Sequence, residues 1–91
     1  MKPKAANEEL SALCKALAHP VRVQILRLLA ERRCLCGDLV EALPVAQSTV
    51  SEHLRILKEA GLIYDEAEGP RRHYCLNQRL LERLKALIAM L

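Results

Sequence analysis

Four cysteines in this sequence could bind a soft metal ion through their thiolates. Cys34 and Cys36 are separated by a single residue, so both of their sulfurs could bind one ion. Neighbouring thiolates suit arsenite, cadmium, lead or zinc, and the pKa of a thiol falls when a metal is bound. A trigonal thiolate site needs a third ligand, which could be Cys75 or Cys14, the latter from the same or a partner subunit. We therefore predict a thiophilic metal or metalloid site at Cys34 and Cys36, with Cys14 or Cys75 as its third ligand.

Some of these cysteines also fit roles that involve no metal. Cys14 falls on the apolar stripe of a predicted helix and Cys75 alternates with apolar neighbours in a predicted strand, so packing is favoured for both. Cys34 and Cys36 have no such packing role, and the alternative to metal binding there is oxidation or reaction with reactive sulfur. A disulfide framework is disfavoured in a cytoplasmic protein. A small thiol enzyme is a weak hypothesis, because no CxxC motif is present and only His73 lies near a cysteine as a possible base.

A second set of polar residues is typical of proteins that bind double-stranded DNA. It lies in a predicted helix over Gln47–Ala60, whose apolar positions Val50, Leu54 and Leu57 recur on one helix face. The other face begins with hydroxyl groups and continues with cations. A glutamine can bind adenine bidentately, a hydroxyl can bond a base or a phosphate, and a carboxylate can accept from the cytosine amino group. The residues that we predict to contact DNA from this helix are Gln47, Ser48, Thr49, Ser51, Glu52 and Arg55.

Two short runs after this helix predict a β-hairpin with a basic tip. Leu62–Asp65 and Arg72–Leu76 flank the sequence Glu68-Gly69-Pro70-Arg71, in which Gly and Pro supply turn chemistry. Arg71 and Arg72 are therefore predicted to contact phosphates from the tip of a wing.

Simpler interpretations of this segment remain open. His53 lies beside the apolar stripe, where a half-buried structural histidine is as reasonable as a DNA contact. The helix could be a solvated amphipathic helix that binds nothing, or the winged unit could serve only protein contacts. Helix, turn and hairpin nevertheless occur together in the order of a winged DNA-binding unit, which favours DNA.

Capping residues predict three helices ahead of this segment. Asn7 can cap a first helix, and Pro20 suits the first position of a second. A short supporting helix over Asp38–Leu43 stops at Pro44. Together with Gln47–Ala60 it forms a predicted helix-turn-helix.

Two further signals complete the predicted fold. Gly61 is suited to end the Gln47–Ala60 helix as a left-handed residue, and Asn77 can cap a last helix whose apolar stripe reaches Leu91. The predicted fold class is mainly α with a small β-hairpin, a winged helix-turn-helix in the order α-α-α-α-β-β-α. The first and last helices carry apolar stripes that a three-helix core cannot cover, so we predict that they form an isologous homodimer interface. A dimer could place two recognition helices in successive major grooves.

The composition excludes several classes of protein. The 91 residues support one domain, residues 1–91, and contain no Phe or Trp, so the core must be aliphatic. A protein that stacks RNA or single-stranded bases on aromatic rings is disfavoured. No apolar run could span a bilayer and no signal-peptide pattern is present, which predicts a cytoplasmic location and no membrane partner. The net charge of +3 is too small to indicate nucleic acid by itself.

Several motifs together identify a family resemblance that covers nearly the whole chain. In combination they are specific, and they resemble the ArsR family of bacterial metal- and stress-responsive repressors. The matching segments are residues 16–22 with Ile25 and Leu26, 37–39, 47–54, 57–63 and 69–74.

The resemblance implies a homodimeric repressor, not an enzyme. Such a protein binds an operator palindrome in double-stranded DNA without a cofactor and releases it when an inducer binds. By position it implies DNA contacts from the same helix and wing residues, although many members carry histidine or arginine at the position of Glu52. His19 matches a position that looks structural in the family.

The cysteines depart from the family pattern. Arsenical- and cadmium-responsive members carry a CxC pair immediately before the Asp-Leu of the supporting helix, whereas Gly37 intervenes here. Val40 stands where some arsenic sensors have a third cysteine. The family's zinc site on the last helix is excluded, because residues 80–91 contain no His or Asp. The predicted inducer is thus a thiophilic metal or metalloid such as arsenite, and thiol oxidation or reactive sulfur is the alternative.

Overall fold

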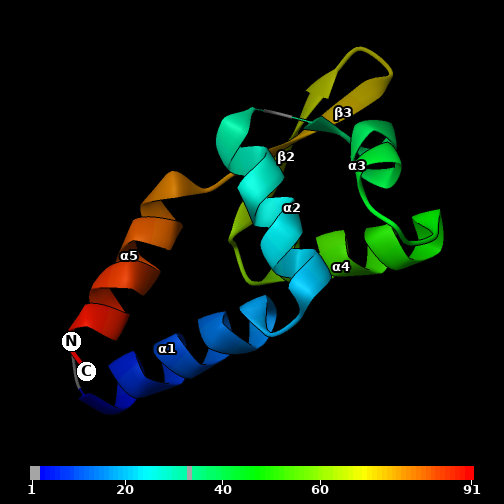
Figure 1. The fold of residues 1–91 in the computed structure, drawn as a ribbon. Helices are drawn as coiled ribbons and strands as arrows, with labels where there is room; N and C mark the ends of the chain where they lie inside the picture. The colour runs from blue at the N-terminus through cyan, green and yellow to red at the C-terminus, as the bar shows by residue number, and fades with distance from the viewer. Residues whose placement is uncertain (1–2, 33) are drawn as a thin grey trace.

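The described residues form five helices and three short strands (Figure 1). The computed structural model describes residues 3–32 and 34–91, with side chains for residues 5–32 and 37–91. The order confirms the predicted winged helix-turn-helix and adds one strand, β1, between α2 and α3. The elements are α1 (Pro3–Leu17), α2 (Pro20–Glu31), β1 (Cys34–Leu35), α3 (Cys36–Ala42), α4 (Gln47–Glu59), β2 (Ile63–Glu68), β3 (Arg71–Leu76) and α5 (Gln78–Ala89).

Two helix starts differ from the predictions. Helix α1 begins at Pro3, so Asn7 lies inside the helix and the predicted cap is wrong. Proline fixes the backbone for the first helical position, which explains the earlier start. Helix α3 begins at Cys36, which places Asp38 in its first turn, where a carboxylate still favours the helix dipole.

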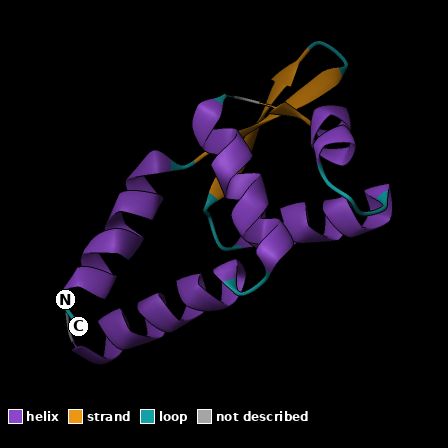
Figure 2. Ribbon diagram, in the orientation of Figure 1, coloured by secondary structure: helices purple, strands orange, loops and turns teal. Residues whose placement is uncertain are grey.

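The wing is the antiparallel hairpin of β2 and β3, and β1 adds a third strand on the other side of β3 (Figure 2). Pairing runs from Ile63 opposite Leu76 to Glu68 opposite Arg71, so the strands are longer than predicted. Gly69 begins the two-residue turn with φ +60, a left-handed conformation that only glycine adopts without strain. The hairpin therefore extends as a narrow ribbon beyond the helices.

Helix α4 is ended by a Schellman motif, as its glycine predicted. Gly61 has φ +84, and its N–H donates to Lys58 O over 2.9 Å. The N–H of Leu62 donates to Leu57 O over 3.1 Å, which closes the second bond of the motif. The chain thus turns sharply from α4 into β2 and holds the wing against the end of this helix.

The core beneath α4 is aliphatic. Leu57 and Leu62 are fully buried, together with Ile25 from α2 and Leu39 from α3. Burial of such side chains stabilises each by about 1.5–3 kcal/mol relative to exposure. Helix α4 is therefore fixed from α2, α3 and the wing at once.

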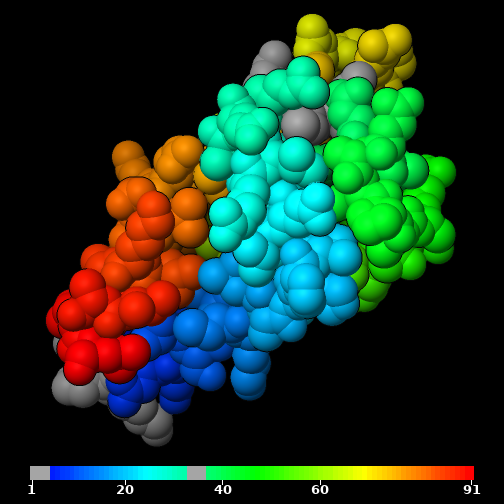
Figure 3. All heavy atoms as spheres, in the orientation of Figure 1, coloured from blue at the N-terminus to red at the C-terminus, as the bar shows by residue number. Residues whose placement is uncertain are grey.

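Helices α1 and α5 lie side by side at one end of the molecule and together form an arm, in which the start of α1 lies near the end of α5 (Figure 1). Figure 3 shows α3, α4 and the hairpin away from this arm. Asn77 caps α5 as predicted, because its side chain accepts the N–H of Leu80 over 3.2 Å. No helix in the described part of the chain is long and apolar enough to cross a membrane.

Candidate nucleic-acid interface

Helix α4 presents two distinct faces. Val50, Leu54 and Leu57 are buried, as predicted, and His53 joins them on the buried side. The opposite side is exposed, and we call it the polar face. It comprises Gln47, Ser48, Thr49, Ser51, Glu52 and Arg55, all six of which were predicted to contact DNA. The structure brings these residues together on one accessible surface, and their contact with DNA stays a prediction.

Arg55 is held on the polar face by two carboxylates. Its Nε and Nη2 atoms donate to the two Oε atoms of Glu52 over 3.0 and 2.5 Å. Its Nη1 atom donates to Glu59 Oε1 over 2.9 Å. The hydrogen bond from Arg55 lowers the pKa of Glu52, and the two carboxylates raise the pKa of Arg55. Arg55 is therefore a fully charged but already paired cation.

A second carboxylate connects α4 to the wing. Asp65 accepts from Lys58 of α4, with Nζ and Oδ1 3.0 Å apart, and from Arg72 of β3, with Nη1 and Oδ2 2.8 Å apart. Its side chain is 13% exposed, whereas those of Lys58 and Arg72 are 53% and 64% exposed. The hydrogen bond from Lys58 is the main cause of a lowered pKa at Asp65. Sequence analysis missed this residue because its partners come from two different elements.

The tip of the wing carries both predicted arginines. Arg71 and Arg72 are exposed. Just inside the tip, the Nε2 atom of His73 contacts Oε2 of Glu68 across the two strands. A shallow cavity of about 210 Å³ lies between wing and helix and is lined by Ser51, Leu54, Arg55, Lys58 and Tyr74.

His53 is a structural residue on the inner side of α4. It is 7% exposed, and its Nδ1 lies 3.1 Å from Nη1 of Arg22. Because arginine can only donate, the imidazole accepts at Nδ1 and is neutral. Burial is the first cause of a lowered pKa at His53. Between its two predicted roles, the structure therefore favours the structural one.

Arg22 of α2 connects the end of α1 to His53 of α4. Its Nε donates to Ala16 O over 2.6 Å and its Nη2 to Lys15 O over 3.3 Å, at the end of α1. His19 caps α2 by accepting the N–H of Val21 at Nδ1, and its ring centroid lies 4.3 Å from that of His53. The structural role expected for His19 is thus confirmed. Sequence analysis did not assign a role to Arg22.

Cys14 and Cys75 lie in different surroundings. Cys75 is buried, as the packing interpretation expected, whereas Cys14 is exposed and that interpretation was wrong for it. The side chains of Cys34 and Cys36 lie outside the described residues. By backbone register Cys34 pairs with Tyr74, the neighbour of Cys75 in β3.

Metal binding by the cysteines stays a prediction. Among the side chains that the structure describes, no three His, Cys, Asp or Glu residues are grouped to hold a metal ion. Cys34 and Cys36, the proposed core of the site, are not among those side chains.

Fold and polar face together define a winged helix-turn-helix regulator. Residues 19–65 match the family described as bacterial regulatory protein, arsR family. An HTH-type transcriptional regulator of Methanocaldococcus jannaschii is 37% identical over 80 residues, which cover 86% of this chain and 90% of that protein. The arsenical resistance operon repressor of Bacillus subtilis is 45% identical over 65 residues, covering 69% and 61% of the two chains.

A solved structure gives the same result. The homodimeric winged helix-turn-helix DNA-binding domain of a possible ArsR-family regulator from Mycobacterium bovis is 33% identical. The structural match covers 99% of this chain and 84% of the Mycobacterium bovis chain, with a TM-score of 0.80. The chain belongs to the ArsR family of bacterial regulatory proteins, and its function in outline is that of a transcriptional repressor.

Proposed function

We propose that this repressor binds double-stranded operator DNA as a homodimer, through the polar face of α4 and the arginines of the wing. The exposed polar face on a helix anchored from three sides is the observation that carries this proposal. The N-terminal residues of α4 would contact base edges, and Arg71 and Arg72 would contact phosphates. DNA binding would need no cofactor, and the protein would act in the cytoplasm, where its operator lies.

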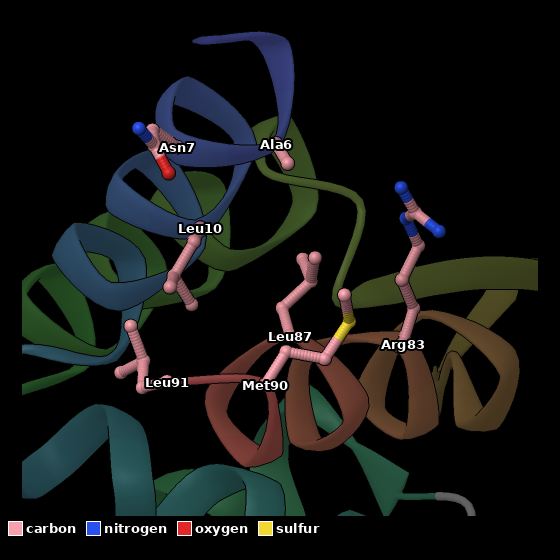
Figure 4. Close-up of a pocket in the computed structure, with 7 residues that line it drawn as sticks. All are labelled: Ala6, Asn7, Leu10, Arg83, Leu87, Met90 and Leu91. Atoms are coloured by element: carbon pink, nitrogen blue, oxygen red, sulfur yellow. The ribbon is translucent and has the colours of Figure 1, made fainter. Parts of the chain in front are cut away.

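The arm of α1 and α5 is the proposed dimer interface. A cavity of about 500 Å³ separates the two helices near their tips, and Leu10 and Leu87 face it (Figure 4). Ile88, Met90 and Leu91 are 47%, 82% and 93% exposed, which is unfavourable in water for a single chain. The homodimeric Mycobacterium bovis domain supports a dimer here too. A second copy would cover these apolar side chains.

The proposed inducer site is the Cys34 and Cys36 pair. Cys34 belongs to β1, which pairs with β3 of the wing, and Cys36 is the first residue of α3, the supporting helix. Binding of a thiophilic ion such as arsenite there would shift α3 or β1 and alter the spacing of the two recognition helices. The name of the Bacillus subtilis relative supports arsenite as the first ion to test.

Two candidates remain for the third ligand, and their positions differ. Cys75 is buried and lies on the opposite face of β3 from Tyr74, the residue that pairs with Cys34, because successive strand residues face opposite sides of a sheet. Cys14 is exposed on α1 and is accessible from a partner subunit. Its exposure also favours the alternative inducer, because an accessible thiol can react with oxidants or reactive sulfur.

The test begins with an operator duplex selected from a random pool by the wild-type protein. Fluorescence anisotropy would follow binding of that duplex with arsenite, cadmium, lead or zinc present under reducing conditions. We expect at least one ion to weaken binding about tenfold or more, a coupling typical of allosteric regulators. The double variant C34S/C36S should bind DNA normally and lose the response, and C14S and C75S should show which thiol is the third ligand.

Other results would redirect or end the proposal. If no ion acts but mild oxidation releases DNA and cross-links Cys34 or Cys36 to another cysteine, the redox alternative holds. A failure of the wild-type protein to select or bind any duplex would refute the DNA-binding function itself.

A further inference from the structure

Three cations on or beside the polar face, Arg55, Lys58 and Arg72, are paired with carboxylates of the same chain. Glu52 and Glu59 hold Arg55, and Asp65 holds both Lys58 and Arg72. Three negative side chains thus oppose three positive ones on the surface that is proposed to meet a polyanion. A repressor that relied only on phosphate attraction would leave these cations without such partners.

Asp65 is the least exposed of these carboxylates and the one that connects two elements. At 13% exposure it lies beneath Lys58 and Arg72 and fixes both side chains relative to each other. An ammonium and a guanidinium that share one carboxylate cannot both turn to a phosphate without leaving that carboxylate unpaired beside DNA. The pairs therefore compete with phosphate for the same two cations.

We propose that Asp65, supported by Glu52 and Glu59, weakens binding to non-operator DNA by holding the cations of α4 and the wing in intramolecular ion pairs. This inference rests on the proposed DNA-binding function. Non-specific affinity depends on how many phosphates a protein neutralises, so cations that stay paired contribute little to it. Operator binding adds base contacts from the residues of the polar face that lie outside these pairs, which are Gln47, Ser48, Thr49 and Ser51. Asp65 is on this basis a specificity-determining residue that need not touch a base.

The matched comparison uses two variants that remove one negative charge each. D65N releases Lys58 and Arg72, whereas E82Q breaks the Glu82–Lys85 pair on α5, away from the polar face. Each is measured by fluorescence anisotropy on a random-sequence 30-base-pair duplex at several salt concentrations. Circular dichroism and sedimentation would confirm that both variants keep the fold and oligomeric state of the wild type.

The expected gain follows from the salt dependence of phosphate contacts. Each additional neutralised phosphate adds about 0.9 to the slope of log affinity against log salt, which is about eightfold in affinity near 0.1 M salt. We expect D65N to bind the random duplex about tenfold more tightly than the wild type, with a steeper slope, and E82Q to match the wild type. Adding K58Q and R72Q to D65N should remove the gain, because the released cations are then absent.

The proposal is overturned if D65N and E82Q show the same affinity and salt slope. Should D65N fail to fold, E59Q replaces it, because Glu59 is exposed and accepts one bond from Arg55; a gain of about two- to threefold is then expected, and none would refute the proposal. Failure of the wild type to bind any duplex would instead refute the proposed function, and this inference with it. A normal wild type with an unchanged D65N would refute the inference alone.

Discussion

The arm of α1 and α5 and the opposite end formed by α4 and the wing expose different kinds of side chain. The arm leaves Ile88, Met90 and Leu91 in water, whereas the opposite end exposes charges and hydroxyls and keeps its aliphatic side chains inside. Ion pairs occur at both ends, but they join different pairs of elements. Glu9 and Arg83 join α1 to α5, with Nε and Oε2 2.5 Å apart, while Asp65 joins α4 to the wing.

This difference indicates what each end is suited to meet. An apolar surface gains free energy when another apolar surface covers it, whereas a paired, hydrated surface remains stable in water until a polyanion replaces its partners. Arg22 lies between the two ends, bonded to the end of α1 on one side and to His53 of α4 on the other. Arg22 therefore connects the arm to α4 through hydrogen bonds.

The largest effect is expected from a charge in the arm. Ile88 is 47% exposed, so I88E should leave the single chain folded but prevent a second copy from covering the apolar surface. We expect sedimentation to show a monomer, and affinity for the selected operator to fall about 100-fold or more, since a monomer engages one half-site. Q78E, on the same helix but at its exposed start, is the control. A dimeric I88E with full affinity would place the interface elsewhere.

The connection between the two ends can be broken at Arg22. R22M keeps the aliphatic stem and removes the bonds to Lys15 O, Ala16 O and His53. We expect a loss of about 2–4 kcal/mol in the free energy of unfolding, measured by urea denaturation, because the partly buried acceptors Ala16 O and His53 Nδ1 lose a charged donor. R22K should recover only part of it, since lysine lacks the planar fork. R27M, at an exposed position of the same helix, should change stability by less than about 0.5 kcal/mol; equal losses in R22M and R27M would contradict this role.

Local signals predicted individual elements better than the connections between elements. The apolar stripe of α4, the left-handed Gly61 and the cap at Asn77 each depend on residues close together in the sequence. All three predictions were confirmed. Strand β1 has two residues, too few for a period, and exists because β3 offers its edge. Arg22 and Asp65 act on partners far along the chain or in another element, which no spacing rule can show.

The exposure of Cys14 shows a limit of helical stripes. Positions i, i+3, i+4 and i+7 cover a broad arc, and the centre of that arc is uncertain from sequence. Helix α1 buries Leu13 and Ala16. Cys14 lies two residues before Ala16, about 200° around the helix. The buried arc is centred on Leu13 and Ala16, so the Cys14 thiol lies outside it and is exposed.

A smaller effect is expected where α4 meets α5. Gly61 has φ +84, and an added Cβ would lie 3.2 Å from Leu80 Cδ2 of α5. We expect G61A to lower the free energy of unfolding by about 1–2 kcal/mol, because a non-glycine residue is strained in the left-handed region and Leu80 must shift. G69A has the same backbone strain, but an added Cβ meets nothing within 4 Å, so it should cost less. The reverse order in thermal or urea unfolding would contradict this account.

The smallest expected effect is the dependence of stability on pH. His53 and the ion-paired carboxylates should affect the free energy of unfolding in different pH ranges. Burial lowers the pKa of His53, with His19 and Arg22 contributing and Glu52 opposing. The folded protein therefore binds the proton less readily than the unfolded chain. The resulting stability is present above the ordinary histidine pKa of 6.5 and is lost as pH falls through the lowered pKa of the folded state.

The carboxylates Glu9, Glu52 and Asp65 also have lowered pKa values, so their contribution to stability is lost in a separate pH range below 4.5. Urea unfolding at pH 7.5 and at steps down to 5 should show a fall in the free energy of unfolding that H53Q reduces, and a fall that is unchanged in H53Q would assign it to other groups.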